Sequence, residues 1–183
     1  MALKRFGIDG FGQLELNQVA FRRDGRIEAQ CALGDDFAEV PCENGMLLAV
    51  DNTNLIVKFP VEGEIFPIAL NYSAEHMYDE RHMALKNFKL EQNSFRPRLG
   101  YLSVQDKFTT NCLCYDDGEF ADDEAVKAAY KSEMIYGGIS EIGAIKVSKE
   151  MPEEGPVLLA VKGTGAGSMP DGQFAIKFQV VRV

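Results

Sequence analysis

The chain has 183 residues, a net charge of −9 at neutral pH, 46% hydrophobic residues and 26% charged residues. This is an ordinary globular composition, and the length suits one domain or two small ones that share an interface. The acidic balance argues against a nucleic-acid partner, because phosphate binding needs clustered Lys and Arg. The longest apolar runs, Met46–Val50 and Pro156–Val161, are much shorter than the roughly 20 residues needed to cross a bilayer, so we expect no membrane partner.

The first half of the chain predicts short β-strands separated by turns. The predicted strands are residues 14–21, 27–33, 46–50, 55–59 and 64–72. Turn residues stand at the breaks, among them Asp24-Gly25, Pro41–Gly45 and Asp51–Asn54. A spacing of about eight to twelve residues between strands is typical of a sandwich or barrel. Pro67 lies inside the fifth segment, and because proline has no N–H to donate, we expect an edge or bulged strand there.

The second half mixes strands with one clear helix. Residues 73–90 predict a short helix or an ordered loop, and residues 94–100 a connector. The remaining predicted strands are 101–104, 108–115, 139–147, 156–162 and 173–183. Apolar residues at helical spacing predict a helix over 121–136, which we expect Gly137-Gly138 to end. The last strand alternates with a period of two, so it either closes the core or pairs between chains.

These elements predict a mainly β fold, with β-sandwich or barrel-like lobes and one or two short helices. An α+β fold is the alternative. We expect an N-terminal β-rich lobe over residues 1–93 and a C-terminal β-rich lobe over residues 94–183, the latter with the helix near 121–136. A single continuous domain is also compatible with the pattern.

The four cysteines and two histidines do not form a recognisable metal motif. Cys112 and Cys114 would share one face of a strand, but their spacing is one residue tighter than the paired ligands of zinc sites. A metal site that joins this pair to His76 or His82 is the weaker alternative to reduced, buried thiols. The start of the chain has no apolar segment of a secretory type, which agrees with synthesis in a cytoplasm.

Six acids fall within nine positions between Asp116 and Glu124 and form the main charge feature. Such a stretch offers oxygen ligands to Ca²⁺, but its order fails the EF-hand pattern. The preferred interpretation is a helix start in which Asp122 is the N-cap, Asp123 and Glu124 occupy the first turn, and the rest is a solvated acidic loop. Whether a cation binds there stays open at the level of sequence.

No motif in the chain predicts catalysis. The glycines at 163, 165 and 167 are followed by a predicted strand, whereas a phosphate loop must lead into a helix. Neither a Gly-x-Ser-x-Gly elbow nor a His-Glu-x-x-His helix occurs. A carboxylate pair for glycoside hydrolysis is possible among 28 acids, but the chain has no Trp to form a sugar platform. We therefore predict no catalytic, cofactor-binding or metal-binding residue, no cofactor, and a protein that is not an enzyme.

Several phrases of the sequence resemble small structural proteins of tailed-phage virions, described as head decoration, cement or head-fibre-type proteins. In the second half they are Phe108–Asn111, the Ala-rich helix, Tyr136–Gly138, Gly143–Ser148, Met169–Gln173 and Lys177–Val180. In the first half they are Asn44–Val50, Pro67–Tyr72, Lys86–Leu90 and Leu99–Val104. The resemblance spans about residues 40–183, and residues 1–39 match no known pattern.

The resemblance implies a non-enzymatic protein on the exterior of a bacteriophage capsid, where it bridges subunits of the major capsid protein. It also implies a homo-oligomer, a dimer or a trimer. The predicted contact elements are the 95–101 connector and the 163–170 loop, with the candidate interface residues Phe95, Arg96, Arg98, Tyr101, Met169 and Pro170. The alternative for the connector is an ordinary linker. The alternative functions are a small β-rich hydrolase or carbohydrate-binding module and, within the virion, a tail or neck component.

Overall fold

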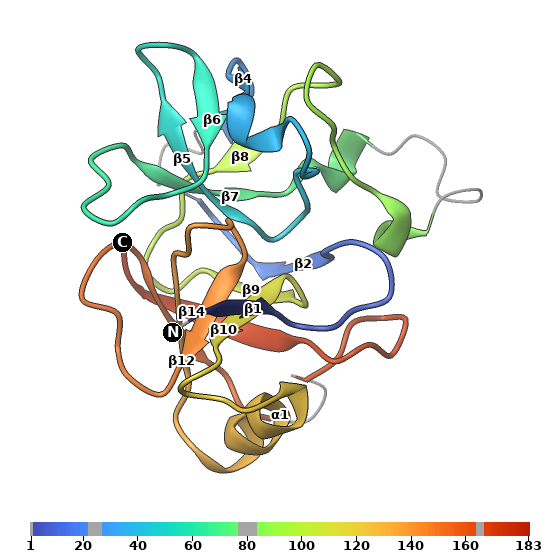
Figure 1. Cartoon of the computed structure of the whole chain (residues 1–183), viewed down its shortest axis with the longest axis vertical. Coiled ribbons are helices and arrows are strands. Elements are labelled where there is room, and N and C mark those ends of the chain that lie inside the picture. The colour runs from blue at the N-terminus through green and yellow to red at the C-terminus, as the bar shows by residue number, and fades with distance from the viewer. Residues whose placement is uncertain (1, 22–26, 77–83, 164–166) are drawn as a thin grey trace.

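A computed structural model describes residues 2–21, 27–76, 84–163 and 167–183 (Figure 1). In these residues the strands form two mixed sheets, accompanied by one α-helix and short 3₁₀ helices. The smaller sheet occupies the upper half of Figure 1, the larger sheet lies below it, and the helix covers the far end of the larger sheet. The predicted mainly β fold with a short helix is confirmed.

The larger sheet has eight strands in the order β1-β10-β12-β11-β13-β14-β9-β2. They are β1 (Leu3–Arg5), β2 (Leu14–Gln18), β9 (Lys107–Thr110), β10 (Leu113–Asp116), β11 (Tyr136–Gly138), β12 (Ile145–Ser148), β13 (Val157–Ala160) and β14 (Ile176–Arg182). Neighbours are antiparallel except β10 and β12. Because β14 pairs with β13 on one side and β9 on the other, the alternating last strand closes the core of its own chain.

The smaller sheet has six strands in the order β3-β8-β7-β5-β6-β4. They are β3 (Ile27–Glu28), β4 (Ala32–Leu33), β5 (Leu47–Asp51), β6 (Ile56–Lys58), β7 (Ile68–Asn71) and β8 (Leu99–Gly100). Strand β7 lies inside the sheet and pairs without a register shift, so the edge or bulged strand expected from Pro67 is wrong. Pro67 precedes the strand, and its carbonyl accepts a hydrogen bond from Val50 N at 3.0 Å, a role that needs no N–H.

Two hydrophobic clusters fill the molecule and share their strands. In β5, Leu47 packs into the first cluster while Leu48 and Val50 pack into the second. In β10, Leu113 and Tyr115 belong to the first cluster and Cys114 to the second. Successive side chains of β5 and of β10 thus point to opposite sides of the strand and enter different clusters. Each of these strands therefore contributes to both hydrophobic clusters.

The sheets do not divide the chain at residue 93. Strands β1 and β2, from the first 20 residues, lie in the larger sheet with the second half of the chain, and β8, which follows residue 93, lies in the smaller sheet. The first cluster also contains Leu47 and Leu70 of the smaller sheet beside Phe108 and Phe178 of the larger. The boundary between the sheets therefore differs from the boundary drawn between the two expected lobes.

Helix α1 (Asp123–Ser132) lies inside the predicted 121–136 segment and begins as expected. Asp122 is its N-cap, and the carboxylate accepts a hydrogen bond from Ala125 N at 2.8 Å. The expected stop at Gly137-Gly138 is wrong, because the helix ends at Ser132 and the glycines belong to β11. A Cβ on Gly137 would lie 2.8 Å from the Ile145 side chain and 2.9 Å from that of Phe178, so glycine allows close packing there.

Two other predicted strands are interrupted where side-chain oxygens, rather than a neighbouring strand, accept hydrogen bonds from the backbone. The 108–115 segment divides into β9 and β10, because Asn111 Oδ1 accepts from Gln13 N at 2.6 Å and Thr110 Oγ1 accepts from Cys112 N at 3.0 Å. The 101–104 segment is not a strand, since Asp106 Oδ2 accepts from Ser103 N at 2.9 Å and forms a turn.

The predicted strand 139–147 is wrong over residues 139–144, because Gly143 N donates to Ser140 O at 3.1 Å and closes a turn between β11 and β12. Other differences concern the first half. The 27–33 segment forms two short strands with different partners, β3 on β8 and β4 on β6. The 73–90 segment contains the 3₁₀ helices Ser73–His76 and Leu85–Asn87, while residues 77–83 and the Asp24-Gly25 turn lie outside the described residues. In the part of the chain that the structure describes, no helix combines the length and the apolar character that a membrane span requires.

Candidate functional site

The four cysteines are free and buried in the described structure. Burial raises the pKa of the Cys112 thiol to about 12, although Arg5 nearby lowers it, and burial raises that of Cys114 to about 11. These thiols therefore stay protonated at neutral pH, whereas a nucleophile or metal ligand needs the thiolate. Among the described residues no group of three His, Cys, Asp or Glu side chains is placed to hold a metal ion. His82 and the side chain of His76 lie outside them.

The acidic stretch from Asp116 to Glu124 holds the helix and the N-terminal strand against the sheet. Asp123 Oδ1 accepts from the buried Tyr115 hydroxyl at 2.8 Å, and its Oδ2 accepts from Gly7 N at 3.0 Å. Asp117 Oδ1 accepts from Ala2 N at 3.0 Å.

The other acids of the stretch are also engaged. Glu119 Oε1 accepts from Ser148 Oγ at 3.1 Å and from Lys149 N at 2.5 Å. Glu124 pairs with Lys127 at 2.6 Å within the helix. The preferred sequence interpretation, a helix start, describes Asp122 to Glu124, but the acids before it tie neighbouring segments together rather than form a freely solvated loop.

The loop that carries the glycines at 163, 165 and 167 connects β13 to β14, and residues 164–166 lie outside the described residues. The next regular element along the chain is a strand, so the loop does not lead into a helix. The geometry of a phosphate loop, in which the helix dipole holds the anion, is not present in the described part of this segment.

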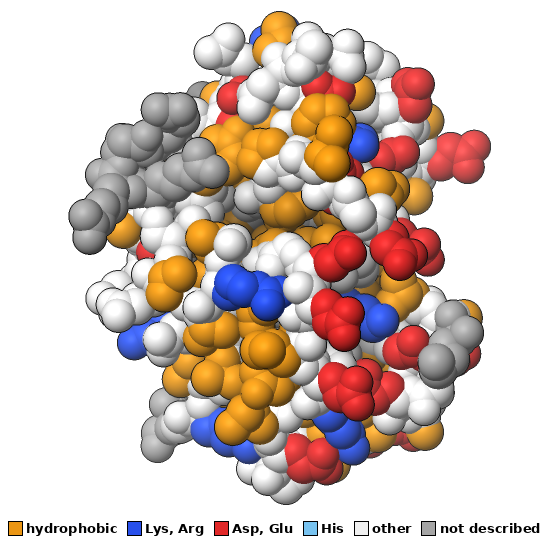
Figure 2. All heavy atoms as spheres, turned by 90° about the vertical axis from the view of Figure 1, so that its left-hand side faces the viewer, with side chains coloured by type: hydrophobic (Ala, Val, Ile, Leu, Met, Phe, Trp, Pro, Cys, Tyr) orange, Lys and Arg blue, Asp and Glu red, His pale blue; other side chains and the backbone are white. Residues whose placement is uncertain are grey.

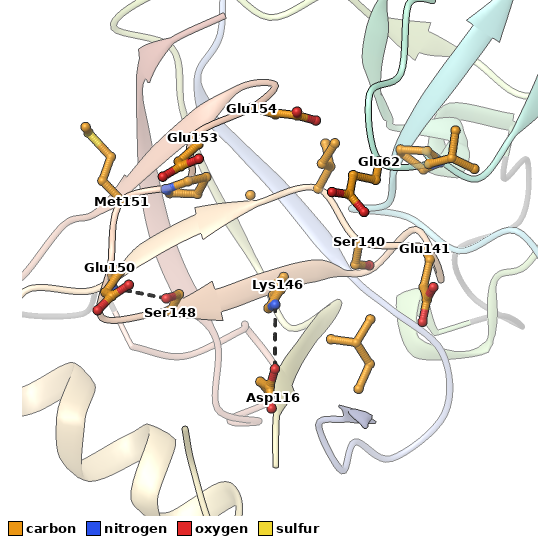
Figure 3. A pocket seen from close by; sticks show the side chains of 16 residues that line it. Glu62, Asp116, Ser140, Glu141, Lys146, Ser148, Glu150, Met151, Glu153 and Glu154 are labelled. Atoms are coloured by element: carbon orange, nitrogen blue, oxygen red, sulfur yellow. Dashed lines mark hydrogen bonds and ion pairs between the residues drawn. The ribbon is translucent and has the colours of Figure 1, made fainter. Parts of the chain in front are cut away.

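A groove of about 580 Å³ lies between the two sheets (Figure 3). Strands β1, β10, β12 and β11 form its floor through Leu3, Asp116, Lys146, Ser148 and Gly138. Its walls are three loops, at 60–62, 139–141 and 150–154. We call this hollow the acidic groove, because six of its lining residues are acidic: Glu62, Asp116, Glu141, Glu150, Glu153 and Glu154.

Two contacts define the shape of the acidic groove. Glu154 Oε2 accepts from Gly63 N at 2.9 Å, which ties the 150–154 wall to the 60–62 wall. A Cβ on Gly138 would lie 2.8 Å from Pro152 Cγ, so the glycine in the floor lets Pro152 pack down on it. Lys146 is the one basic residue among the described residues of the lining, and its Nζ lies 3.8 Å from Asp116 Oδ2.

Four of the six groove acids are exposed, and their carboxylates have no hydrogen-bond or ion-pair partner among the described residues. They are Glu62, Glu141, Glu150 and Glu153. The carboxylates outnumber the single ammonium group by five, against a net charge of −9 for the whole chain. The groove thus concentrates a large part of the negative charge of the protein in one hollow.

An apolar strip borders the acidic groove on the outward face of the larger sheet. Tyr136 of β11 is paired in register with Ser148, which lines the groove, and with Leu159 of β13. Val181 lies on the outward face of β14, and Met134 Sδ lies 2.9 Å from Tyr136 Oη. Met134 and Val181 are 61% and 37% exposed. Gln179 is the register partner of Leu159 on β14, so Met134, Tyr136 and Leu159 form the strip and Val181 lies at its margin. Figure 2 shows hydrophobic side chains gathered in the lower half of one face, with acidic side chains along its right-hand side.

The residues predicted to form an interface differ in exposure and do not lie in one hollow. Tyr101 and Met169 are buried within the chain, at 5% and 2% exposure, whereas Phe95 is 68% exposed. Arg96 and Pro170 are exposed, Arg98 is half-buried, and Arg96 Nη1 donates to Gln30 O at 2.5 Å. Met169 and Pro170 line a second hollow of about 580 Å³ with Lys162 and Lys177, and the connector residues do not line it.

The acidic groove was missed from the sequence because its acids come from loops that are distant along the chain. Glu153-Glu154 is the one adjacent pair among them, in the segment between the predicted strands 139–147 and 156–162. The apolar strip had a weak signal: Tyr136 and Leu159 alternate with residues that point to the core, but their neighbours on the outward face cannot be known before the strand order is known.

Comparison of the chain with protein-family models, with curated protein sequences and with solved structures found no match, so the site described here rests on the geometry of this molecule.

Proposed function

We propose that the protein is a non-enzymatic structural protein of a tailed-phage virion, which binds the exterior of the assembled capsid and bridges subunits of the major capsid protein. The resemblance over residues 40–183 supports this assignment, and so does the face formed by the apolar strip and the acidic groove. An apolar centre beside charged residues is the usual composition of a protein–protein interface.

The observation that carries the proposal is the apolar strip. Single exposed apolar residues are normal on protein surfaces, whereas a contiguous set marks an interaction site. Here Tyr136 and Leu159 are paired side by side on strands in the interior of the sheet, and Met134 contacts the tyrosine. No described helix covers this outward side, since the buried residues of α1 belong to the first cluster on the inner side.

The first experiment mixes the purified protein with capsids stripped of their accessory proteins. We expect the protein to cosediment with the capsids and to raise the temperature at which they release DNA. We expect Met134→Glu with Val181→Glu to weaken cosedimentation at least about tenfold, because the two new charges must be desolvated at the interface. A Val40→Glu variant, also at an exposed apolar site, is the control for the added charge.

The proposal fails if the wild-type protein neither cosediments nor protects the capsids. Equal loss of binding in the strip variant and in Val40→Glu would remove the strip from the interface. A Phe95→Glu variant tests the connector predicted from the sequence in the same assay, and its binding decides whether the connector belongs to the contact. Localisation on intact particles by cryo-EM separates a head protein from a tail or neck component.

The alternative of a glycan-directed protein has one specific observation in its favour, the carboxylates on opposite walls of the acidic groove. The described lining of the groove contains no Phe, Tyr or Trp, the side chains on which sugar rings usually stack. Saturable binding on a glycan array that is lost in Glu62→Gln with Glu153→Gln would favour this alternative over capsid binding.

A further inference from the structure

We infer that the acidic groove binds an extended protein segment rich in Lys and Arg. The inference deepens the proposed function and rests on it for the source of the segment, the coat protein. Its chemistry follows from the groove itself.

The sign of the charge selects the ligand. Six carboxylates and one ammonium group line the hollow, and that ammonium group already lies beside Asp116. The carboxylates of Glu62, Glu141, Glu150 and Glu153 are exposed and have no hydrogen-bond or ion-pair partner among the described groups. A cationic ligand would relieve the mutual repulsion of these groups, and an anionic one would add to it.

The spacing of the carboxylates favours several separate cations over one metal ion. A Ca²⁺ ion takes six to eight oxygens at about 2.3–2.6 Å, so its ligands must converge on one point. The described acids of the groove include no group of three that is placed to hold a metal ion. Instead they stand on three walls and on the floor, an arrangement that suits successive basic side chains along a chain.

The apolar part of the lining fits the stems of such side chains. Val61 and Met151, on opposite walls, are 52% and 58% exposed, and Ile139 and Pro152 are half-buried beside them. Lys and Arg lay their methylene stems on apolar surface while the charged head reaches a carboxylate. A free metal ion or a small polyamine would leave most of this apolar surface exposed.

The groove is already shaped before a ligand arrives. The hydrogen bond from Gly63 N to Glu154 joins two walls, and Pro152 packs on Gly138 in the floor. A preformed site saves the entropy of ordering loops, which raises affinity for a segment that is itself flexible. The continuity of the floor with the apolar strip, through the paired Ser148 and Tyr136, allows one partner to contact both.

The test uses an oligolysine peptide and isothermal titration at low and at physiological salt. We expect the wild-type protein to bind the peptide, with affinity that falls as salt rises. The variant Glu62→Gln with Glu153→Gln removes one charge from each of two walls and should weaken binding about tenfold, since each exposed ion pair contributes modestly. The matched control, Glu15→Gln with Glu39→Gln, removes the same charge outside the groove and should bind like the wild type.

Three results would overturn the inference. They are the absence of peptide binding by the wild type, equal weakening in the groove variant and the control, and binding of Ca²⁺ alone that the groove variant abolishes while the peptide does not bind. The four substituted side chains form no hydrogen bond or ion pair with the described residues. Thermal unfolding of both variants should therefore match the wild type and exclude misfolding as the cause.

The stripped-capsid assay separates this inference from the proposed function. If the wild type binds the peptide through Glu62 and Glu153 but does not cosediment with capsids, the groove binds basic segments and the proposed virion role is wrong. If the groove variant cosediments as well as the wild type and the wild type does not bind the peptide, the virion role stands and the inference about the groove is wrong.

Discussion

Two groups of acidic residues in this molecule differ in whether their carboxylates bond to the rest of the chain. The acids from Asp116 to Glu124 lie close together in sequence. Their carboxylates accept hydrogen bonds from, or form ion pairs with, residues that flank the N-terminal strand, the helix, and residues 148 and 149. The acids of the groove come from separate loops, and most of them face solvent without a described partner. The acids that cluster in the sequence therefore stabilise the fold, whereas the acids of the candidate site are brought together only when the chain folds.

Asp116 belongs to both groups of acids. Its Oδ1 accepts from Gly118 N at 2.9 Å and its Oδ2 lies 3.8 Å from Lys146 Nζ. Asp116 is thus both the first acid of the sequence cluster and part of the groove floor. Because it is already engaged, we assign the ligand contacts of the groove to the acids on its walls. The comparison predicts that substitutions in the cluster change stability and that substitutions on the groove walls change binding.

The largest effect on stability is expected for Asp123→Ala. The substitution leaves the buried Tyr115 hydroxyl without its acceptor at 2.8 Å and removes the acceptor of Gly7 N. An unsatisfied buried hydroxyl together with a lost first-turn carboxylate should lower the free energy of unfolding by about 2 kcal/mol, measured by urea denaturation. Asp123→Asn keeps an acceptor oxygen and should lose less. A loss below about 0.5 kcal/mol in the alanine variant would contradict the structural role of this cluster.

A smaller effect is expected for Asp122→Ala. Its carboxylate caps the helix by accepting from Ala125 N, and the loss of such a cap typically costs about 1 kcal/mol. Asp122→Ser retains a capping oxygen and should restore most of the stability in the same denaturation series. If the serine variant were as unstable as the alanine variant, the contribution of Asp122 would come from its charge rather than from the cap.

The smallest effect is expected for the groove walls. Glu62→Gln with Glu153→Gln alters two exposed side chains that have no described partner, so the free energy of unfolding should stay within about 0.5 kcal/mol of the wild type. A modest gain is compatible with relief of like-charge repulsion. A loss comparable to that of Asp123→Ala would show that the groove acids stabilise the fold, and the contrast between the two groups would disappear.

The sequence predicted the elements whose signals are local. The Asp122 cap and the apolar spacing of Val126, Ala129 and Tyr130 identified the helix, and the period-two alternation identified β14. The errors arose where a side chain or a distant strand decided the outcome. Asn111 divides a continuous apolar run by accepting from Gln13 N, which lies 98 positions away along the chain.

The candidate site depended almost entirely on distant pairing. The groove floor exists because β1 pairs with β10 and because β10 pairs in parallel with β12, and neither pairing has a signature in the residues concerned. Likewise, Tyr101 and Met169 were predicted as interface residues of the 95–101 connector and the 163–170 loop, but tertiary packing buries both. Local patterns report which face of a strand is apolar, whereas strand order decides what that face meets.

The most direct test of the contrast between the two acid groups is carbodiimide coupling of an oligolysine peptide to the native protein, with the joined carboxylates mapped by mass spectrometry. The reagent links amines to carboxylates that are in contact, so it reads both groups in one sample. We predict coupling at Glu62, Glu141, Glu150 and Glu153, and little at Asp117, Glu119 and Glu124. Coupling that follows exposure over the whole surface, or that concentrates between Asp116 and Glu124, would contradict the account.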